Sequence, residues 1–362
     1  MASTLSTGRR DALVSRLSDA SISTMEVCCV YLGDRLGLYR ALRASGPATA
    51  AELAAAAKIS ERYAREWLEQ QAVAGILDAD AAADASARRY TLPPEHAEVL
   101  LDPDSLSMLA PVVQLIVGLT SQLPALLAAF RSGGGLTWSQ YGADVREGQA
   151  GQNRPVFVKL LGSEWLPAIA DVHARLLADP PARVADVACG AAWSAIGMAR
   201  AYPKIRVDGF DLDEASVALA RDNVAGAGLA DRVAVSVRDV ADPALAGRYD
   251  LVTIFESLHD VSRPVDLLRH VRRMLAPGGA VLVMDERVAE TFTAPGDAVE
   301  RLMYGYSVLC CLPCGLADQP SAATGTVMRP ATVRRYALEA GFQRLDVLPI
   351  AHDFFRFYRL YP

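Results

Sequence analysis

Carboxylates accompany apolar stretches at three points in the second half of the sequence. Asp186 lies within the first stretch, Asp211 follows the second and Asp239 follows the third. If these stretches are parallel strands, their carboxyl ends meet at one edge of a sheet, so the three carboxylates gather there. Asp211 is then suited to accept hydrogen bonds from the hydroxyls of a ribose, and Asp239 from the amino group of an adenine. The spacing indicates a site for a nucleoside-containing ligand.

A turn of small residues connects the first apolar stretch to a predicted helix that begins at about Ser194. The N–H groups at the start of a helix attract anionic groups such as a carboxylate, and Gly190 lets the backbone come close to a ligand. We assign this turn to the same site as the acidic residues and their apolar neighbours. The predicted cofactor-binding residues are Asp186, Ala188, Gly190, Asp211, Leu212, Asp239, Val240 and Glu256.

His259 is the candidate for proton transfer. Among the five histidines, it alone lies at the carboxyl end of a predicted strand, the fourth, which spans residues 250–255. The unperturbed pKa of histidine, about 6.5, suits it to accept a proton from a hydroxyl or an amine. The competing interpretation is a structural histidine that caps or packs a helix.

The elements that must position these residues follow from the periodicity of the sequence. From Val184 onward, apolar stretches alternate with helical patterns, which is typical of a parallel α/β sheet. A turn at 277–279 precedes the fifth strand, and the last two stretches are predicted to form an antiparallel hairpin. The predicted strands span residues 183–188, 205–210, 233–237, 250–255, 280–284, 345–350 and 353–360.

Residues 1–100 have a different pattern. One or two helices are predicted within 11–42, followed by shorter helices over 50–58 and 60–74, the last with Ser60 as its N-cap. Residues 76–77 and 89–92 then read as a two-stranded wing. This order of elements predicts a winged-helix domain, which serves either DNA binding or dimerisation.

Charge favours dimerisation over DNA binding. The helix over 60–74 carries Glu61, Glu66 and Glu69, and the whole chain has a formal net charge of −6. Both oppose binding to a phosphate backbone, so we predict no nucleic-acid partner. Apolar residues between Leu13 and Leu42 exceed what a small wing domain can bury by itself. We therefore predict a homodimer formed through the N-terminal helices.

Length and composition are those of a two-domain globular protein, with 362 residues, 52% of them apolar and 22% charged. We predict a winged-helix domain at 1–100, a helical linker that lines a pocket at 101–178, and a cofactor-binding domain at 179–362. The chain shows no secretion signal, and its longest apolar stretch, Leu109 to Leu119, is too short for a bilayer. The expectation is a cytoplasmic protein without a membrane partner.

Cysteine usage predicts no metal site. The six cysteines are expected to stay reduced in a cytoplasmic chain. Cys311 and Cys314 form a C-x-x-C pair, but a closed zinc site needs four ligands, and no second Cys or His pair lies close in sequence. Apolar packing is the preferred interpretation of this pair.

Three motifs together resemble the class I methyltransferases that use S-adenosylmethionine (SAM). They are residues 184–190, 209–211 and 275–279. With the helices and wing that precede it, the whole chain resembles bacterial small-molecule O-methyltransferases that carry a winged-helix dimerisation domain. A nicotinamide-binding Rossmann domain is the weaker alternative, because the G-x-G-x-x-G turn is absent.

The resemblance implies an α/β fold with a seven-stranded, Rossmann-like methyltransferase sheet behind the mostly helical winged-helix domain. It also implies SAM as cofactor, with Asp186 and Gly190 at its methionine end, Asp211 at the ribose and Asp239 at the adenine. The segment Leu258-His259-Asp260 resembles one in O-methyltransferases where the histidine is the general base. The family usually has glycine where this chain has Ala188 and Ala192, which adds a methyl group near the ligand.

The predicted function is methyl transfer to a small molecule, with O-methylation favoured and His259 as general base. The alternatives are S-, N- or C-methylation by proximity alone, or a SAM-binding regulator without turnover. The long connection after the fifth strand and the segment at 138–141, together with 152–154, are predicted to cover the acceptor. Tyr141 and Tyr304 are the predicted substrate contacts, because each pairs a ring with a hydroxyl beside a glycine. Dimer packing is the competing role for these aromatic segments.

Overall fold

The computed structural model describes residues 7–81 and 84–362. It divides into two compact units, the first made of residues up to Val117 together with 147–152, and the second of 118–146 together with 153–362. The segment 101–178 therefore contributes residues to both units.

The first unit begins with a long helix and continues as a helical domain with a small wing. The predicted N-terminal helical region is two helices, because Gly37 adopts a left-handed conformation (φ 69°) between them. Its elements are α1 (Thr7–Arg35), α2 (Leu38–Ser45), α3 (Ala50–Ala57), α4 (Glu61–Val73), β1 (Asp78–Ala79), β2 (Tyr90–Thr91) and α5 (Pro94–Leu101).

Two local predictions for this domain need correction. The first wing strand lies at 78–79 rather than 76–77, because the N–H groups of Ile76 and Leu77 both donate to the Gln71 carbonyl at the end of α4. Ser60 is the N-cap residue of α4, yet its side chain makes no capping hydrogen bond with the described residues. Thr49 instead forms a complete capping box with Glu52 at the start of α3.

The second unit contains a sheet of seven strands among the described residues, in the order β5-β4-β3-β6-β7-β9-β8. Strands β3 to β7 are parallel and β8 and β9 pair antiparallel, as the sequence predicts, and β9 is also antiparallel to β7. The order reverses on either side of β3, so the carboxyl ends of β3 and its neighbours are the place where an α/β sheet binds ligands. The strands are β3 (Arg183–Val187), β4 (Arg206–Asp211), β5 (Val233–Val237), β6 (Tyr249–Phe255), β7 (Leu275–Glu286), β8 (Arg344–Val347) and β9 (Phe355–Tyr361).

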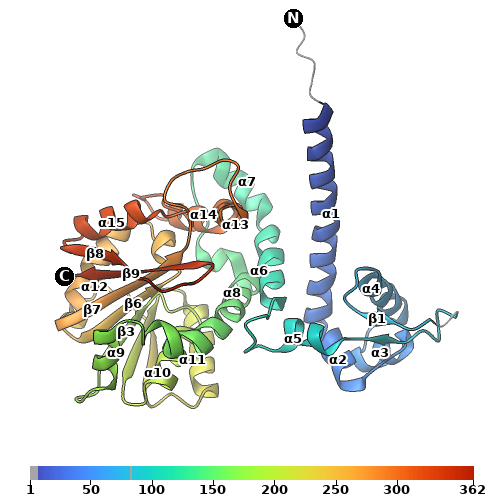
Figure 1. The fold of residues 1–362 in the computed structure, drawn as a ribbon, viewed down its shortest axis with the longest axis horizontal. Helices are drawn as coiled ribbons and strands as arrows, with labels where there is room; N and C mark the ends of the chain where they lie inside the picture. The colour runs from blue at the N-terminus through green and yellow to red at the C-terminus, as the bar shows by residue number, and fades with distance from the viewer. Residues whose placement is uncertain (1–6, 82–83) are drawn as a thin grey trace, which may run out of the picture. The chain divides into compact units, whose positions relative to one another are not determined.

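Helices cover both faces of this sheet (Figure 1). Alternate residues of β3 serve the two faces: Val184 packs with one core cluster, whereas Ala185 and Val187 pack with the other. Because a parallel strand buried on both sides needs mostly apolar residues, β3 is apolar apart from Arg183 at its start and the buried Asp186. One face holds α9 (Ala170–Leu177), α10 (Trp193–Ala201) and α11 (Glu214–Gly226), and the other holds α12 (Pro264–Met274) and α15 (Pro330–Glu339).

The predicted turn at 277–279 is part of strand β7, which runs without interruption from Leu275 to Glu286. The pairing with β6 shifts register between Tyr249 and Leu251, and Gly278 takes up the irregularity with φ 79°. A turn motif in the sequence is therefore a bulge in the structure.

Helical segments lie before the sheet and within the connection after β7. The second group occupies the long connection where the sequence predicts a cover for the acceptor. The segments are α6 (Ala110–Ser121), α7 (Leu123–Ser132), η1 (Trp138–Tyr141), α8 (Gly142–Val156), η2 (Phe157–Trp165), η3 (Pro243–Leu245), η4 (Leu258–Asp260), α13 (Ala298–Tyr306), η5 (Ser307–Cys311) and α14 (Leu312–Leu316). No single helix of the described residues has the length and apolarity to cross a membrane, and only the bent pair α6 and α7 meets these criteria jointly.

Candidate active site

Asp186 lies inside the sheet edge and holds the first turn in place. It is 1% exposed, and its carboxylate accepts hydrogen bonds from the hydroxyls of Ser194 at the start of α10 and Thr253 on β6. Burial raises the pKa of Asp186 to about 6, against the opposing effect of these two hydroxyls. Both carboxylate oxygens are thus engaged within the protein, and the residue acts on the turn rather than from the surface.

The turn after β3 has an unusual backbone. Ala188, Gly190 and Ala192 have φ values of 54°, 50° and 63°, all in the left-handed region. Glycine adopts this region freely, whereas alanine does so at a cost of about 1–2 kcal/mol. No described atom lies within 4 Å of the position that a Cβ on Gly190 would occupy. The turn is therefore open at Gly190 and strained at its two alanines.

Asp211 joins the first turn to the second strand end. One of its carboxylate oxygens accepts from the backbone N–H of Gly190 (2.8 Å) and the other from that of Asp213 (2.9 Å). Burial raises the pKa of Asp211, although these hydrogen bonds oppose the shift. A carboxylate offers about four acceptor positions, so two remain for other donors. Leu212 beside it is 70% exposed, so its apolar side chain is available to a ligand.

At the end of the third strand, the two predicted cofactor-binding residues, Asp239 and Val240, differ in exposure. Asp239 is exposed, and one of its carboxylate oxygens accepts from the N–H of Ala241 at 2.8 Å. Val240 is buried in the core cluster that also contains Phe210 and Leu245. The Asp239 carboxylate is therefore accessible to a ligand, whereas the Val240 side chain is part of the hydrophobic core.

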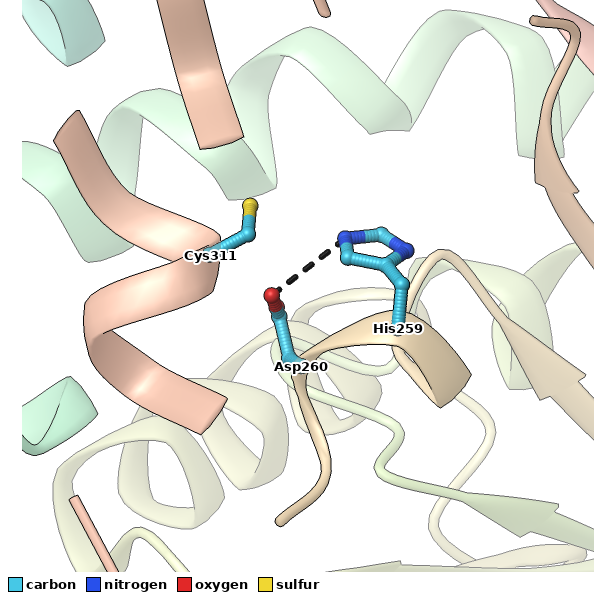
Figure 2. Close-up of side chains that lie close together, drawn as sticks. All are labelled: His259, Asp260 and Cys311. Carbon is cyan, nitrogen blue, oxygen red and sulfur yellow. Dashed lines mark ion pairs between the residues drawn. The ribbon is translucent and has the colours of Figure 1, made fainter. Parts of the chain in front are cut away.

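Three carboxylates surround His259, whose side chain is 2% exposed. Its Nδ1 atom lies 2.8 Å from Asp285 Oδ1 and 3.1 Å from Glu286 Oε2, both at the end of β7. Its Nε2 atom lies 3.3 Å from Asp260 Oδ1 (Figure 2). Burial lowers the pKa of His259, but the charges of Asp285, Glu286 and Asp260 outweigh it and raise this pKa well above the usual range.

Glu256 occupies the end of β6 in a left-handed conformation (φ 51°). It accepts a hydrogen bond of 2.7 Å from the side-chain amide of Asn153. Burial and the charge of Glu286 raise the pKa of Glu256 to about 8, while burial raises that of Glu286 to about 7 against the effect of His259. Near neutral pH these two carboxyls therefore hold a proton for part of the time, which limits the negative charge around His259.

The two predicted substrate residues, Tyr141 and Tyr304, differ in exposure and in hydroxyl partners. Tyr141 is 2% exposed, and its hydroxyl donates to the Leu309 carbonyl at 2.9 Å, so it links η1 to η5. Tyr304 is exposed and its hydroxyl lies 3.4 Å from Arg329 Nη2. Tyr306 is the tyrosine beside the acidic cluster: burial raises its pKa to about 12, with contributions from Cys311 and Glu256. Helical spacing explains this, because residues two positions apart on a helix face different directions.

Sequence reasoning missed Asp285, Glu286 and Cys311. Asp285 and Glu286 directly follow the fifth predicted strand, as Asp211 follows the second. The reasoning that places acidic residues after a strand at the edge of the sheet would therefore also have identified these two. The C-x-x-C pair marks Cys311 in the sequence, where apolar packing is the preferred interpretation, but the sequence does not define the path of the helical connection that brings this thiol to His259 and Asp260. Asn153 belongs to a polar stretch that the sequence assigns to the acceptor cover and interprets as a break between helices, but the structure places it within the continuous helix α8.

Comparison with known families identifies both parts of the chain. Residues 184–279 match the family described as a methyltransferase domain, and residues 5–101 match the Rv2258c-like winged HTH domain. A curated relative, the ubiquinone/menaquinone biosynthesis C-methyltransferase UbiE of Geobacter sulfurreducens, is 32% identical over 133 residues, which is 36% of this chain and 50% of the relative. The chain thus spans about half the length of that relative.

Solved structures of other proteins share the fold of this chain over nearly its whole length. The mitomycin 7-O-methyltransferase MmcR superposes with a TM-score of 0.72 at 21% identity, covering 98% of this chain and 99% of MmcR. Human N-acetylserotonin methyltransferase, solved in complex with SAM, gives a TM-score of 0.71 at 17% identity, covering 100% and 99% of the two chains.

The chain therefore carries a SAM-dependent methyltransferase domain behind an N-terminal winged-helix domain. SAM is the methyl donor of this class, and the residues at the sheet edge fit it. The turn is open at Gly190, Asp211 retains acceptor capacity, and Leu212 presents an uncovered apolar side chain.

Proposed function

We propose that the protein transfers the methyl group of SAM to a hydroxyl of a small molecule, with His259 as general base. The observation that carries the proposal is the hydrogen bond of 2.8 Å between His259 Nδ1 and the buried Asp285, at the carboxyl edge of the methyltransferase sheet. A carboxylate in this position fixes the ring and its tautomer, so that Nε2 is the atom that accepts a proton.

The residues that would hold SAM follow from the site. Gly190 and Ala188 would line the methionine end, Asp211 the ribose hydroxyls, and Leu212 and Asp239 the adenine, while Asp186 would position the turn without contact. SAM supplies an electrophilic methyl group on a sulfonium. Alignment of that methyl with the acceptor in a water-poor site can provide much of the rate.

His259 contributes the proton transfer. Its Nε2 would accept the hydroxyl proton as the new oxygen–carbon bond forms, and Asp285 and Glu286 at Nδ1 would stabilise the resulting imidazolium. The carboxylates of Asp285 and Asp260 beside the imidazole favour an acceptor that is neutral or cationic, because an anionic one would meet like charge. These features support a phenol or alcohol over a carboxylate acceptor.

We also propose a homodimer formed through α1. This helix exposes a series of large apolar side chains, which soluble proteins rarely leave uncovered. Their exposures are 53% for Leu13, 59% for Val14, 58% for Leu17, 60% for Ile22 and 68% for Met25.

The test is methyl transfer from labelled SAM to a panel of phenols, alcohols, thiols and amines. His259→Ala is expected to lower turnover with a hydroxyl acceptor by about 10²–10⁴-fold, the usual contribution of a general base. SAM affinity, measured by calorimetry, should change little. A thiol acceptor should lose less, since it ionises near neutral pH without help. Unchanged turnover with the hydroxyl acceptor would show that proximity alone carries the reaction, and SAM binding without turnover of any acceptor would favour a regulator.

A further inference from the structure

Three side chains with different donor atoms converge beside the proposed base. His259, Asp260 and Cys311 each offer one ligand atom, and these atoms all lie within 4.8 Å of one another. Figure 2 shows the imidazole, the carboxylate and the thiol pointing toward a common space, the first two from η4 and the third from η5. One nitrogen, one oxygen and one sulfur form the mixed donor set that zinc accepts in proteins.

The spacing fits a tetrahedral ion. With metal–ligand distances of about 2.0–2.3 Å, two ligands of a tetrahedral zinc lie roughly 3.3–3.8 Å apart. His259 Nε2 and Asp260 Oδ1 are 3.3 Å apart. The Cys311 thiol lies within 4.8 Å of both of these atoms. Small adjustments of these side chains would therefore suffice to bind the ion.

The surroundings of the imidazole strengthen this fit. A histidine that ligates zinc usually donates its other ring N–H to a carboxylate, and His259 Nδ1 does so to Asp285 at 2.8 Å. Asp260 Oδ1 has no contact with solvent and accepts no hydrogen bond from the described residues, and its described partner is the His259 imidazole at 3.3 Å. A buried carboxylate oxygen in that state is stabilised by a cation.

The backbone around the three residues is well held. Gly325 donates its N–H to the His259 carbonyl at 3.2 Å, and Gly315 of α14 packs against the Asp260 backbone, where an added Cβ would meet the carbonyl oxygen at 3.5 Å. Two elements far apart in sequence are thus fixed side by side. Sequence spacing alone points away from a metal site, because the ligands come from separate elements rather than from two C-x-x-C pairs.

We propose that His259, Asp260 and Cys311 form a binding site for Zn²⁺, with the fourth position open to water. The ion would compete with a proton for His259 Nε2, so that its binding would block the base and inhibit methyl transfer reversibly. The inhibition rests on the proposed function, whereas the binding does not.

Cobalt(II) tests the binding directly, because a thiolate ligand gives it a charge-transfer absorption band. The full-length protein, stripped with a chelator and kept reduced, is titrated with Co²⁺ without SAM or acceptor. We expect one equivalent to produce the thiolate band and tetrahedral d–d bands, and one equivalent of Zn²⁺ to remove them. Cys311→Ser should lose the thiolate band and weaken Co²⁺ binding at least tenfold. His259→Ala should weaken binding while retaining a thiolate band.

Two other cysteine variants serve as controls. Cys28→Ser removes an exposed thiol of α1 and should leave the titration unchanged. Cys314→Ser removes a thiol near Cys311 and should retain the band. The proposal is overturned if wild type gives no thiolate band, if Cys311→Ser keeps it, or if Cys314→Ser abolishes it. Circular dichroism establishes that each variant is folded. Since SAM is absent, failure here leaves the methyl-transfer proposal standing, and failure of methyl transfer leaves the titration intact.

Discussion

Among single residues, the two acidic groups at the first strand ends have different roles: one can contact a ligand, and the other holds the backbone in position. Asp186 and Asp211 follow from the same sequence pattern, yet the first is enclosed by two hydroxyls while the second remains half-buried at the edge. Burial decides which carboxylate can meet a ligand, and the sequence does not reveal it. Asp211 is therefore the residue through which SAM binding is best tested.

Asp211→Ala is expected to weaken SAM binding by about 1–3 kcal/mol, the scale of losing hydrogen bonds to a charged acceptor. The ribose hydroxyls would lose their partner, and the Gly190 N–H would lose its acceptor. Isothermal calorimetry measures the change. Asp222→Ala, an exposed carboxylate on α11, is the matched control and should bind SAM as wild type does. Equal affinities for the two variants would remove Asp211 from the ribose site.

The pH dependence of turnover follows from the charges around His259. Because Asp285, Glu286 and Asp260 raise the pKa of His259 against the effect of burial, the neutral, proton-accepting form dominates only at higher pH. The rate with a hydroxyl acceptor should therefore still be rising above pH 6.5, where an unperturbed histidine is half protonated. Asp285→Asn removes the principal charge that raises this pKa, so the rising limb should move to lower pH, with a reduced maximum because the ring is less well oriented. A limb that does not move would mean that another group sets the profile.

At the scale of elements, the sequence predicts the strands that carry the site well. Strand β5 matches its prediction at both ends, and β3, β4 and β6 differ by a residue, because apolar stretches buried on both faces are long and continuous. The prediction is weaker where hydrogen bonds override the pattern, as at Ile76 and at the bulge of β7. It gives no information on which residues of α13 and η5 face the cluster, because that depends on how the connection folds back. That Tyr306 and Cys311 lie beside the cluster is evident only from the structure.

The strained turn after β3 offers a test of local backbone energetics. Ala188→Gly should raise the free energy of unfolding by about 0.5–1 kcal/mol, because relief of the left-handed strain exceeds the added flexibility of glycine. Ala234→Gly, at an exposed position of β5, is the control and should lower it by about 0.5–1 kcal/mol. Chemical denaturation measures both. If the two variants are destabilised equally, the conformation of Ala188 costs nothing and the departure from the family pattern has no energetic consequence.

At the scale of the whole molecule, the groups proposed for chemistry all belong to the second unit, so the first unit must be retained for another reason. Its helix α4 pairs Arg62 with Glu66 and Arg65 with Glu61 on its own surface. This pairing neutralises the cations that a nucleic-acid groove would require. What the first unit does expose is the apolar surface of α1, and a second copy of the same helix is the partner that covers it most simply.

Light scattering on the full chain should therefore give the mass of a dimer, and Leu17→Glu with Ile22→Glu should shift it to a monomer. Both residues are more than half exposed, at 58% and 60%, so the charges are tolerated by the isolated fold but not within an apolar interface. Ser18→Glu with Ser23→Glu adds the same charges at polar, exposed positions of the same helix and should remain dimeric. Because α1 contributes little to the described core, the apolar double variant should keep its melting temperature at low protein concentration. A monodisperse monomer for wild type would refute the dimer and leave the apolar surface of α1 to some other partner.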